Sequence, residues 1–301
     1  MPPMSLDAPD QAESPIGRAI PRRYVALGLI VLAIILVGIL VLIRNANQTD
    51  TTSDVETITP APSSVMTSVS QVPAATSSAV GVTSPNSTIT PPSSTGNTSL
   101  WQSPANGAGA KPVVFFYGAE FAPYAAAERW PLVVALSRFG TFGPLGLMQS
   151  SSSIAFSDTA SFTFWHVKYS SVWVDFQSVE RYSTLNPTGI GYMSLQTPTD
   201  RQAASVAVYD SSAGTFPLLD IANHYVLVGS SFSPSVLDGL SQAQIAADLA
   251  FPTNPVTQAI LASANEITAA ICTVTAARPT AVCSARGVAA ADSAMQIHRV
   301  G

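Results

Sequence analysis

Charged residues are scarce in this sequence. Only 10% of its residues are Asp, Glu, Lys or Arg, whereas about a quarter is usual for a soluble domain. The net charge is -5, and the 13 Lys and Arg residues are scattered along the chain. A protein that binds a phosphate backbone normally gathers its positive charges on one surface. We therefore expect no nucleic-acid partner.

Histidine and the common catalytic motifs are also scarce. The three histidines, His166, His224 and His298, lie far apart and lack the spacing of metal ligands. The chain contains no phosphate-binding glycine loop, no Gly-x-Ser-x-Gly and no His-Glu-x-x-His. The sequence therefore predicts no metal site and no cofactor.

The chain has only two cysteines, Cys272 and Cys283. In an oxidising compartment a disulfide across this short loop would contribute about 3 kcal/mol of stability. Ten residues separate the two cysteines, unlike the two-residue spacing that tunes a reactive thiolate. We favour a structural disulfide, with a redox-active pair as the alternative.

One long apolar segment stands out against this background. Tyr24–Ile43 contains no charged residue and, at about 1.5 Å per residue, is long enough to span the roughly 30 Å of a hydrocarbon core. Three arginines lie in the tail 1–23 and one, Arg44, follows the segment, which places the N-terminus in the cytoplasm. We predict a single-pass anchor in the cell membrane, with the rest of the chain extracytoplasmic. A twin-arginine export signal at Arg22-Arg23 is the less favoured alternative.

Residues 44–109 are dominated by Ser, Thr, Pro, Ala and Val, and no charge occurs between Glu56 and Lys111. This composition predicts a disordered stalk, because it offers too little apolar surface to offset the entropy of ordering. Three stretches in it match the acceptor pattern for N-glycosylation: Asn47-Gln48-Thr49, Asn86-Ser87-Thr88 and Asn97-Thr98-Ser99.

The composition changes at residue 110, where we predict an α/β domain that extends to residue 301. Val113–Tyr117 is an apolar run typical of a central strand, and a helix is expected to follow it as far as Arg138. Further along we expect a pair of strands at Phe162–Phe164 and Val172–Phe176, and a helix over Asp200–Tyr209. A hairpin is expected at Leu218–Ile221 and Tyr225–Val228, and a helix that begins at Asn254-Pro255.

This order of elements resembles a thioredoxin-like domain, a central mixed sheet flanked by helices. The segment "GAEFAPYA", Gly118 to Ala125, is similar to the approach to a thioredoxin or glutaredoxin active site, and Phe216-Pro217 resembles the cis-proline turn beside it. More narrowly, "GAEFAPYAAAERWPLVVALSRFGTF" and "FPLLDIANHYVLVGSSFSP" resemble DUF929, a prokaryotic family of unknown function, over about Lys111 to the C-terminus.

The resemblance implies a pair of cysteines at positions 122 and 125, and both are alanine here. Position 116, where many thioredoxins bury an acid, is phenylalanine, and no Ser, Thr or Lys occurs within residues 118–127. We therefore predict no catalytic residue, with Ala122 and Ala125 as degenerate dithiol positions. Two origins fit this pattern: loss of the redox role in the lineage, or deliberate replacement of both thiols.

What remains at the turn is a set of residues suited to binding: Phe121, Pro123, Tyr124, Phe216 and Pro217. We expect them to line an apolar groove that holds an extended peptide or a protein of the cell envelope. The charged residues nearby, Glu120, Glu128 and Arg129, are read as site candidates or, for the last two, as a solvated helix face with a local ion pair. The alternative function is an inactivated thiol–disulfide oxidoreductase, and a further one is a rigid structural head on its stalk.

Overall fold

The protein is described by a computed structural model, which defines residues 58–81, 89–104, 109–184, 191–209 and 216–297. The predicted cytoplasmic tail 1–23 and membrane segment Tyr24–Ile43 lie outside the described residues. None of the helices in the described part is both long and apolar enough to cross a membrane.

A five-stranded mixed sheet forms the centre of the described region. Its strand order is β1-β9-β8-β2-β7. The strands are β1 (Ser93–Ser94), β2 (Val113–Gly118), β7 (Asp175–Glu180), β8 (Leu218–Ile221) and β9 (Tyr225–Val228). Strand β7 runs parallel to β2, whereas β8 runs antiparallel to β2 and β9 antiparallel to β8. β2 is central and nearly all buried, which explains why its sequence is a continuous apolar run.

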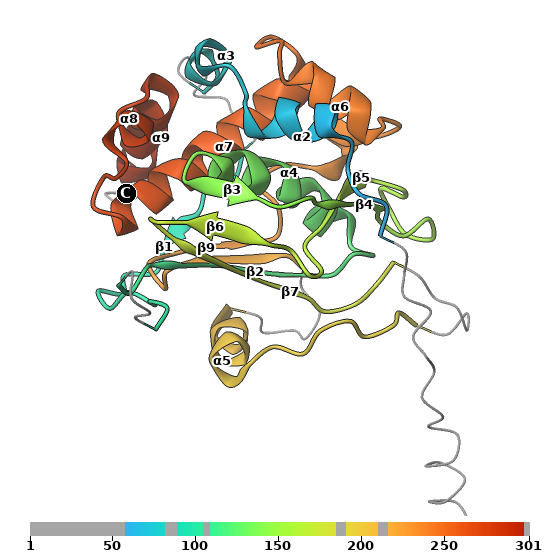
Figure 1. Cartoon of the computed structure of the whole chain (residues 1–301), viewed down its shortest axis with the longest axis horizontal. Helices are drawn as coiled ribbons and strands as arrows, with labels where there is room; N and C mark the ends of the chain where they lie inside the picture. Colours follow the sequence, from blue (N-terminus) through green and yellow to red (C-terminus); the bar gives the residue numbers. More distant parts are fainter. Residues whose placement is uncertain (1–57, 82–88, 105–108, 185–190, 210–215, 298–301) are drawn as a thin grey trace, which may run out of the picture. The chain divides into compact units, whose positions relative to one another are not determined.

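Helices cover both faces of this sheet (Figure 1). On one face lie α4 (Pro123–Ser137) and α7 (Pro255–Val274), which pack against each other. The other face carries α5 (Asp200–Tyr209), whose Ser205 hydroxyl donates a 2.6 Å hydrogen bond to Asp220 of β8. The side chains of β2 alternate accordingly: Val114 and Phe116 join the large core under α4 and α7, and Val113 and Phe115 join a small cluster on the α5 side.

Shorter elements complete the fold. Two small antiparallel pairs are formed by β3 (Gly140–Phe142) with β6 (Tyr169–Ser171) and by β4 (Gly146–Gln149) with β5 (Ala160–Thr163). The remaining helices after β9 are η1 (Pro234–Leu237), α6 (Gln242–Asp248), α8 (Thr280–Cys283) and α9 (Arg286–Ile297).

Several elements confirm the prediction from sequence. The helix at Asp200–Tyr209 and the hairpin at Leu218–Ile221 and Tyr225–Val228 have the predicted bounds. Helix α7 begins after Asn254, whose side chain accepts a hydrogen bond from the Val256 N–H. The predicted pairing of Phe162–Phe164 with Val172–Phe176 is wrong, because β5 pairs with β4 and the strand after residue 174 pairs with β2.

The prediction of a disordered stalk is also wrong for the part of it that the structure describes. Residues 58–81 contain α2 (Ser63–Ser70) and α3 (Ala74–Ala79), and β1 within 89–104 is an edge strand of the central sheet. Ahead of α2, Thr59 and Ala61 form 2.8 Å backbone hydrogen bonds with Leu147 and Leu145. Val65 and Val69 of α2 are buried in the main core. The valines are four residues apart, so they share one helix face, which a reading by composition overlooks.

The predicted disulfide between Cys272 and Cys283 is confirmed. It joins the C-terminal part of α7 to the end of α8, and the two Cα atoms are 5.7 Å apart. The described part of the chain contains no free cysteine. In this position the bond holds the short helix α8 against the long core helix α7.

We predict that Val69→Ala lowers the free energy of unfolding of the full-length chain by about 2 kcal/mol, because it leaves a cavity between α2 and the core. Urea unfolding followed by tryptophan fluorescence measures this change. Thr67→Ala, at an exposed position of the same helix, is the control and should have little effect. Equal stability of both variants would contradict the packing of α2 on the domain.

Candidate functional site at the start of α4

The turn that leads from β2 into α4 carries the two alanines of the predicted site. Ala122 is the N-cap of α4 and Pro123 its first residue, and no side chain caps the helix. Ala122 is 6% exposed and Ala125 is fully buried. The uncapped N–H groups and the positive end of the helix dipole would stabilise an anionic group placed at position 122.

Aromatic rings surround this turn. Phe121 lies edge-on to Phe216, with 5.9 Å between the ring centroids, and it stacks on Tyr192 at 3.9 Å. Tyr182 lies 6.3 Å from both Phe121 and Phe216. The fold therefore brings Phe121 and Phe216-Pro217 together, as expected, and the Phe216-Pro217 peptide bond is cis. Tyr182 and Tyr192 were missed, because they lie in irregular segments without a periodic pattern.

The exposed surface of the site is smaller than an open groove would require. Phe216 is 9% exposed and both Pro123 and Pro217 are buried. Tyr124 is 42% exposed, and its ring contacts Phe156 edge-on rather than the Phe121 cluster. Tyr124 together with the partly buried Phe121 therefore forms the accessible part of the site.

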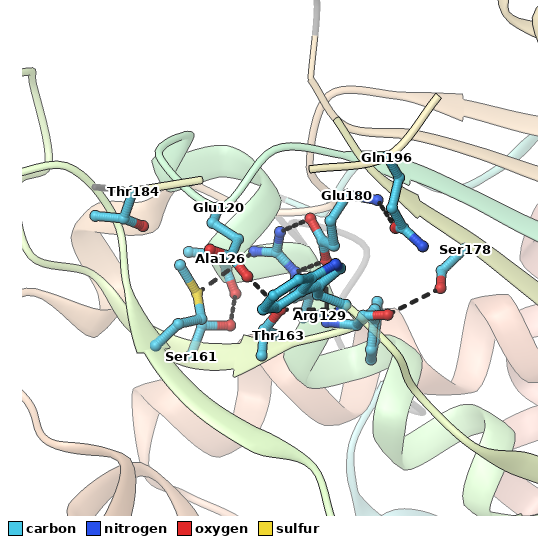
Figure 2. Close-up of polar contacts among 12 residues, drawn as sticks. Glu120, Ala126, Arg129, Ser161, Thr163, Ser178, Glu180, Thr184 and Gln196 are labelled. Atoms are coloured by element: carbon cyan, nitrogen blue, oxygen red, sulfur yellow. Dashed lines mark hydrogen bonds and ion pairs between the residues drawn. The ribbon is translucent and has the colours of Figure 1, made fainter. Parts of the chain in front are cut away.

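A buried ion pair lies behind the turn (Figure 2). Arg129 of α4 binds Glu180 of β7 through two hydrogen bonds, of 3.0 Å from Nε and 2.6 Å from Nη2, and both side chains are fully buried. Glu180 also accepts a 3.1 Å hydrogen bond from the N–H of Phe164. The guanidinium lies 5.4 Å from the centroid of the Phe116 ring. The interpretation of Glu128 and Arg129 as a solvated helix face with a local ion pair is therefore wrong.

Glu120, at the turn itself, is also buried. Its side chain accepts a hydrogen bond from the Thr163 hydroxyl, and its N–H donates to the Tyr182 carbonyl over 2.8 Å. On the other side of the turn, the Phe121 carbonyl accepts a 2.9 Å hydrogen bond from the N–H of Ser151. These bonds hold the turn between two loops, so its backbone is fixed in the absence of any ligand.

Glu128 is the second buried carboxyl group of α4. Burial raises its pKa to about 8, although the N–H and the hydroxyl of Ser231 both donate hydrogen bonds to it, at 2.7 and 3.0 Å. Nearby Glu266 of α7 adds to the increase, and burial raises the pKa of Glu266 itself to about 7. Two facing core helices therefore carry carboxyl groups that are largely protonated at mildly acidic pH.

The side chains that the fold gathers at this turn are mostly aromatic. The turn has no cysteine, serine, threonine or lysine within residues 118–127, and the Glu180 carboxylate is paired with Arg129. In the part of the chain that the structure describes, no group of three His, Cys, Asp or Glu residues is arranged to hold a metal ion.

Comparison with known families identifies the family of this chain. The model of a domain of unknown function, DUF929, matches residues 100–273, more than half of the sequence. The chain therefore belongs to the DUF929 family. No curated protein and no solved structure matches it. The matched region contains the turn, the central strands except β1, and all of α7 except its last residue.

The buried carboxyl groups predict how stability changes with pH. In the unfolded chain Glu128 ionises above about pH 4.5, whereas in the folded chain it keeps its proton up to about pH 8. The contribution of Glu128 therefore favours the folded state most at low pH, and it declines as the pH rises from about 5 to 8. Glu128→Gln, which mimics the protonated form, should flatten this decline when urea unfolding is measured at several pH values.

Glu266→Gln is the companion variant and should remove a smaller part of the decline, because the pKa of Glu266 is raised less. Asp238→Asn is the control, since Asp238 is exposed in the turn that follows η1. A pH profile identical in the parent and in Glu128→Gln would show that Glu128 ionises normally in the folded protein.

Proposed function

We propose that this protein is a thioredoxin-like binding module of the cell envelope, anchored by Tyr24–Ile43 and lacking the redox dithiol. Its ligand is an extended segment of polypeptide, which lies along the edge formed by Phe216-Pro217 and contacts Phe121 and Tyr124.

The topology supports the thioredoxin-like assignment. Apart from the two small strand pairs, η1 and α6, the elements from β2 to α7 follow the chain order β2, α4, β7, α5, β8, β9 and α7. Inside the edge strand β1 the sheet order is β9-β8-β2-β7, with β7 parallel to β2. Helices α4 and α7 share one face of the sheet and α5 lies on the other (Figure 1). This is the arrangement expected from the resemblance, with the degenerate turn at the start of the first helix.

The observation that carries the proposal is the contact between Phe121 and Phe216. It places the edge that precedes β8 directly beside the start of α4. Antiparallel pairing of β8 with β2 ends at Leu218 and Tyr117. Among the described residues, the backbone N–H and C=O of Phe216 have no hydrogen-bond partner. An extended peptide could therefore pair with this backbone while its side chains contact the aromatic rings.

We predict that a photoreactive benzoylphenylalanine in place of Tyr124 crosslinks to a polypeptide in intact envelopes of cells that produce the full-length chain. The matched control carries the same group at Val208 of α5, which is 71% exposed and lies on the other side of the sheet. Adducts are detected by immunoblotting and tested for sensitivity to protease. Absence of adducts from position 124, or the same adducts from position 208, would refute binding at this site.

The alternative function is that of a thiol–disulfide oxidoreductase from which both thiols have been lost. The geometry of the turn supports this alternative, because position 122 is at the N-cap of α4 and position 125 is one helical turn further on. A cysteine at 122 would face the helix dipole, which lowers a thiol pKa, and positions i and i+3 of a helix lie within the Cα separation of a disulfide.

For this alternative we expect that Ala122→Cys/Ala125→Cys reduces insulin disulfides in the presence of dithiothreitol, whereas the parent and Ala122→Cys alone do not exceed the background. The full-length chain is required, because a fragment beginning at residue 110 would lack α2, α3 and β1. If the double variant forms its disulfide but remains inactive, the site is not an oxidoreductase scaffold.

A further inference from the structure

A pocket with polar groups that lack partners lies at the opposite end of α4. Its volume is about 200 Å³. The residues that matter to the argument are Arg138, Asn265, Val72, Val282, Ala285 and Val288, all of which line it. They come from the C-cap of α4, from α7, from the segment between α2 and α3, and from α8, α9 and the link between these two helices. Helix α4 is about 22 Å long, so this pocket is separate from the site at Ala122.

Arg138 supplies a positive charge to this pocket. Its Nη1 donates a 2.8 Å hydrogen bond to the Thr268 hydroxyl and a long one of 3.5 Å to the Ala264 carbonyl. Its Nη2 is closed to solvent and has no hydrogen-bond partner among the described residues. Burial lowers the pKa of Arg138 to about 10, so the group stays charged at neutral pH. Within the described part of the chain it forms no ion pair.

Asn265 supplies an acceptor to the same pocket. Its Nδ2 donates to the carbonyls of Ser77 and Val80 over 3.0 and 3.2 Å. These two acceptors fix the orientation of the amide, so Oδ1 is the oxygen that remains buried without a partner among the described residues. Gly287 packs against this amide so closely that an added Cβ would lie 2.5 Å from Asn265 Nδ2. The position of the amide is therefore fixed from both sides.

Buried polar groups without partners are costly, because they have lost water without gaining another hydrogen bond. In a native protein such groups usually contact a water molecule or a ligand. Here a cationic donor and a neutral acceptor without partners belong to two residues that line one pocket, and its other walls are mostly apolar. This combination indicates an anion with a hydrogen-bond donor and a short apolar chain.

We propose that this pocket binds a small 2-hydroxycarboxylate. The carboxylate accepts hydrogen bonds from Arg138, the hydroxyl group donates to Asn265 Oδ1, and a short branched chain packs against Val72, Val282 and Val288. The pocket volume corresponds to that of about seven water molecules, at about 30 Å³ each. This volume is suitable for a molecule of this size.

Binding requires a small movement of the pocket wall, because Arg138 Nη2 and Asn265 Oδ1 are closed to solvent in the empty pocket. Helix α8 forms part of that wall, and the Cys272–Cys283 disulfide holds α8 to α7. In this proposal the movement involves side chains of the wall and α8, a helix of four residues.

We expect 2-hydroxyisovalerate to bind the full-length chain with a dissociation constant of about 1 mM or lower, measured by isothermal titration calorimetry at pH 7. Isovalerate should bind more weakly because it lacks the donor for Asn265, and the uncharged 2-hydroxyisovaleramide should bind more weakly because it lacks the carboxylate for Arg138. Arg138→Gln should weaken binding of 2-hydroxyisovalerate by at least about tenfold.

Ala285→Leu is the matched variant, because it fills the pocket and leaves Arg138 and Asn265 in place. It should abolish binding while the urea midpoint of the empty protein stays near that of the parent. The proposal is overturned if the parent gives no saturable heat, which would mean that the pocket holds water only. It is equally overturned if Ala285→Leu, shown to be folded, binds as the parent does. Neither result bears on the site at Ala122, whose tests do not involve this pocket.

Discussion

The buried pair of Arg129 and Glu180 is the interaction on which the candidate site depends. It joins α4 to β7 and, through the Phe164 N–H, to the segment that follows β5. Both side chains have been removed from water, so loss of either would leave an uncompensated charge in the core, at a cost of about 3–5 kcal/mol. The pair therefore fixes α4 relative to β7, and with it the turn that precedes α4. The rigidity of the turn follows from this constraint and from the backbone bonds of Glu120 and Phe121.

The elements that were predicted from sequence are those with local signals. Helix α7 begins with an Asn-Pro N-cap, and the β8-β9 hairpin has two apolar runs around a short turn. The Arg129–Glu180 pair has no such signal, because its partners come from different elements. Helix α4 is buried on nearly all sides, between the sheet and α7. Its sequence therefore shows no polar face from which the burial of Glu128 or Arg129 could be predicted.

Composition led to a wrong prediction for residues 58–81, whereas the family resemblance indicated which segments meet at the turn before α4. Residues 58–81 are rich in Ser and Thr, yet two valines on one face of α2 are enough to anchor it to a core supplied by α4 and α6. Propensity and composition are averages over a whole segment, so they do not reveal a few apolar residues that share one helix face. The proximity of Phe121 and Phe216 followed from the resemblance alone, since no pattern in either segment identifies the other. Tyr182 and Tyr192 complete the cluster through contacts that depend on how the chain folds back after β7.

The small side chains at positions 122 and 125 determine what the turn offers to a ligand. Alanine at both places adds no polar side-chain group, so the proposed recognition relies on the uncapped N–H groups of α4 and the backbone of Phe216, beside the Phe121 ring. Recognition through backbone hydrogen bonds tolerates many peptide sequences, whereas the aromatic surface favours an apolar side chain. A site of this kind gains affinity from being held in place before binding, because little conformational entropy is lost when the ligand arrives. The buried Arg129–Glu180 pair, which contacts no ligand in this proposal, therefore acts on binding by keeping that surface in position.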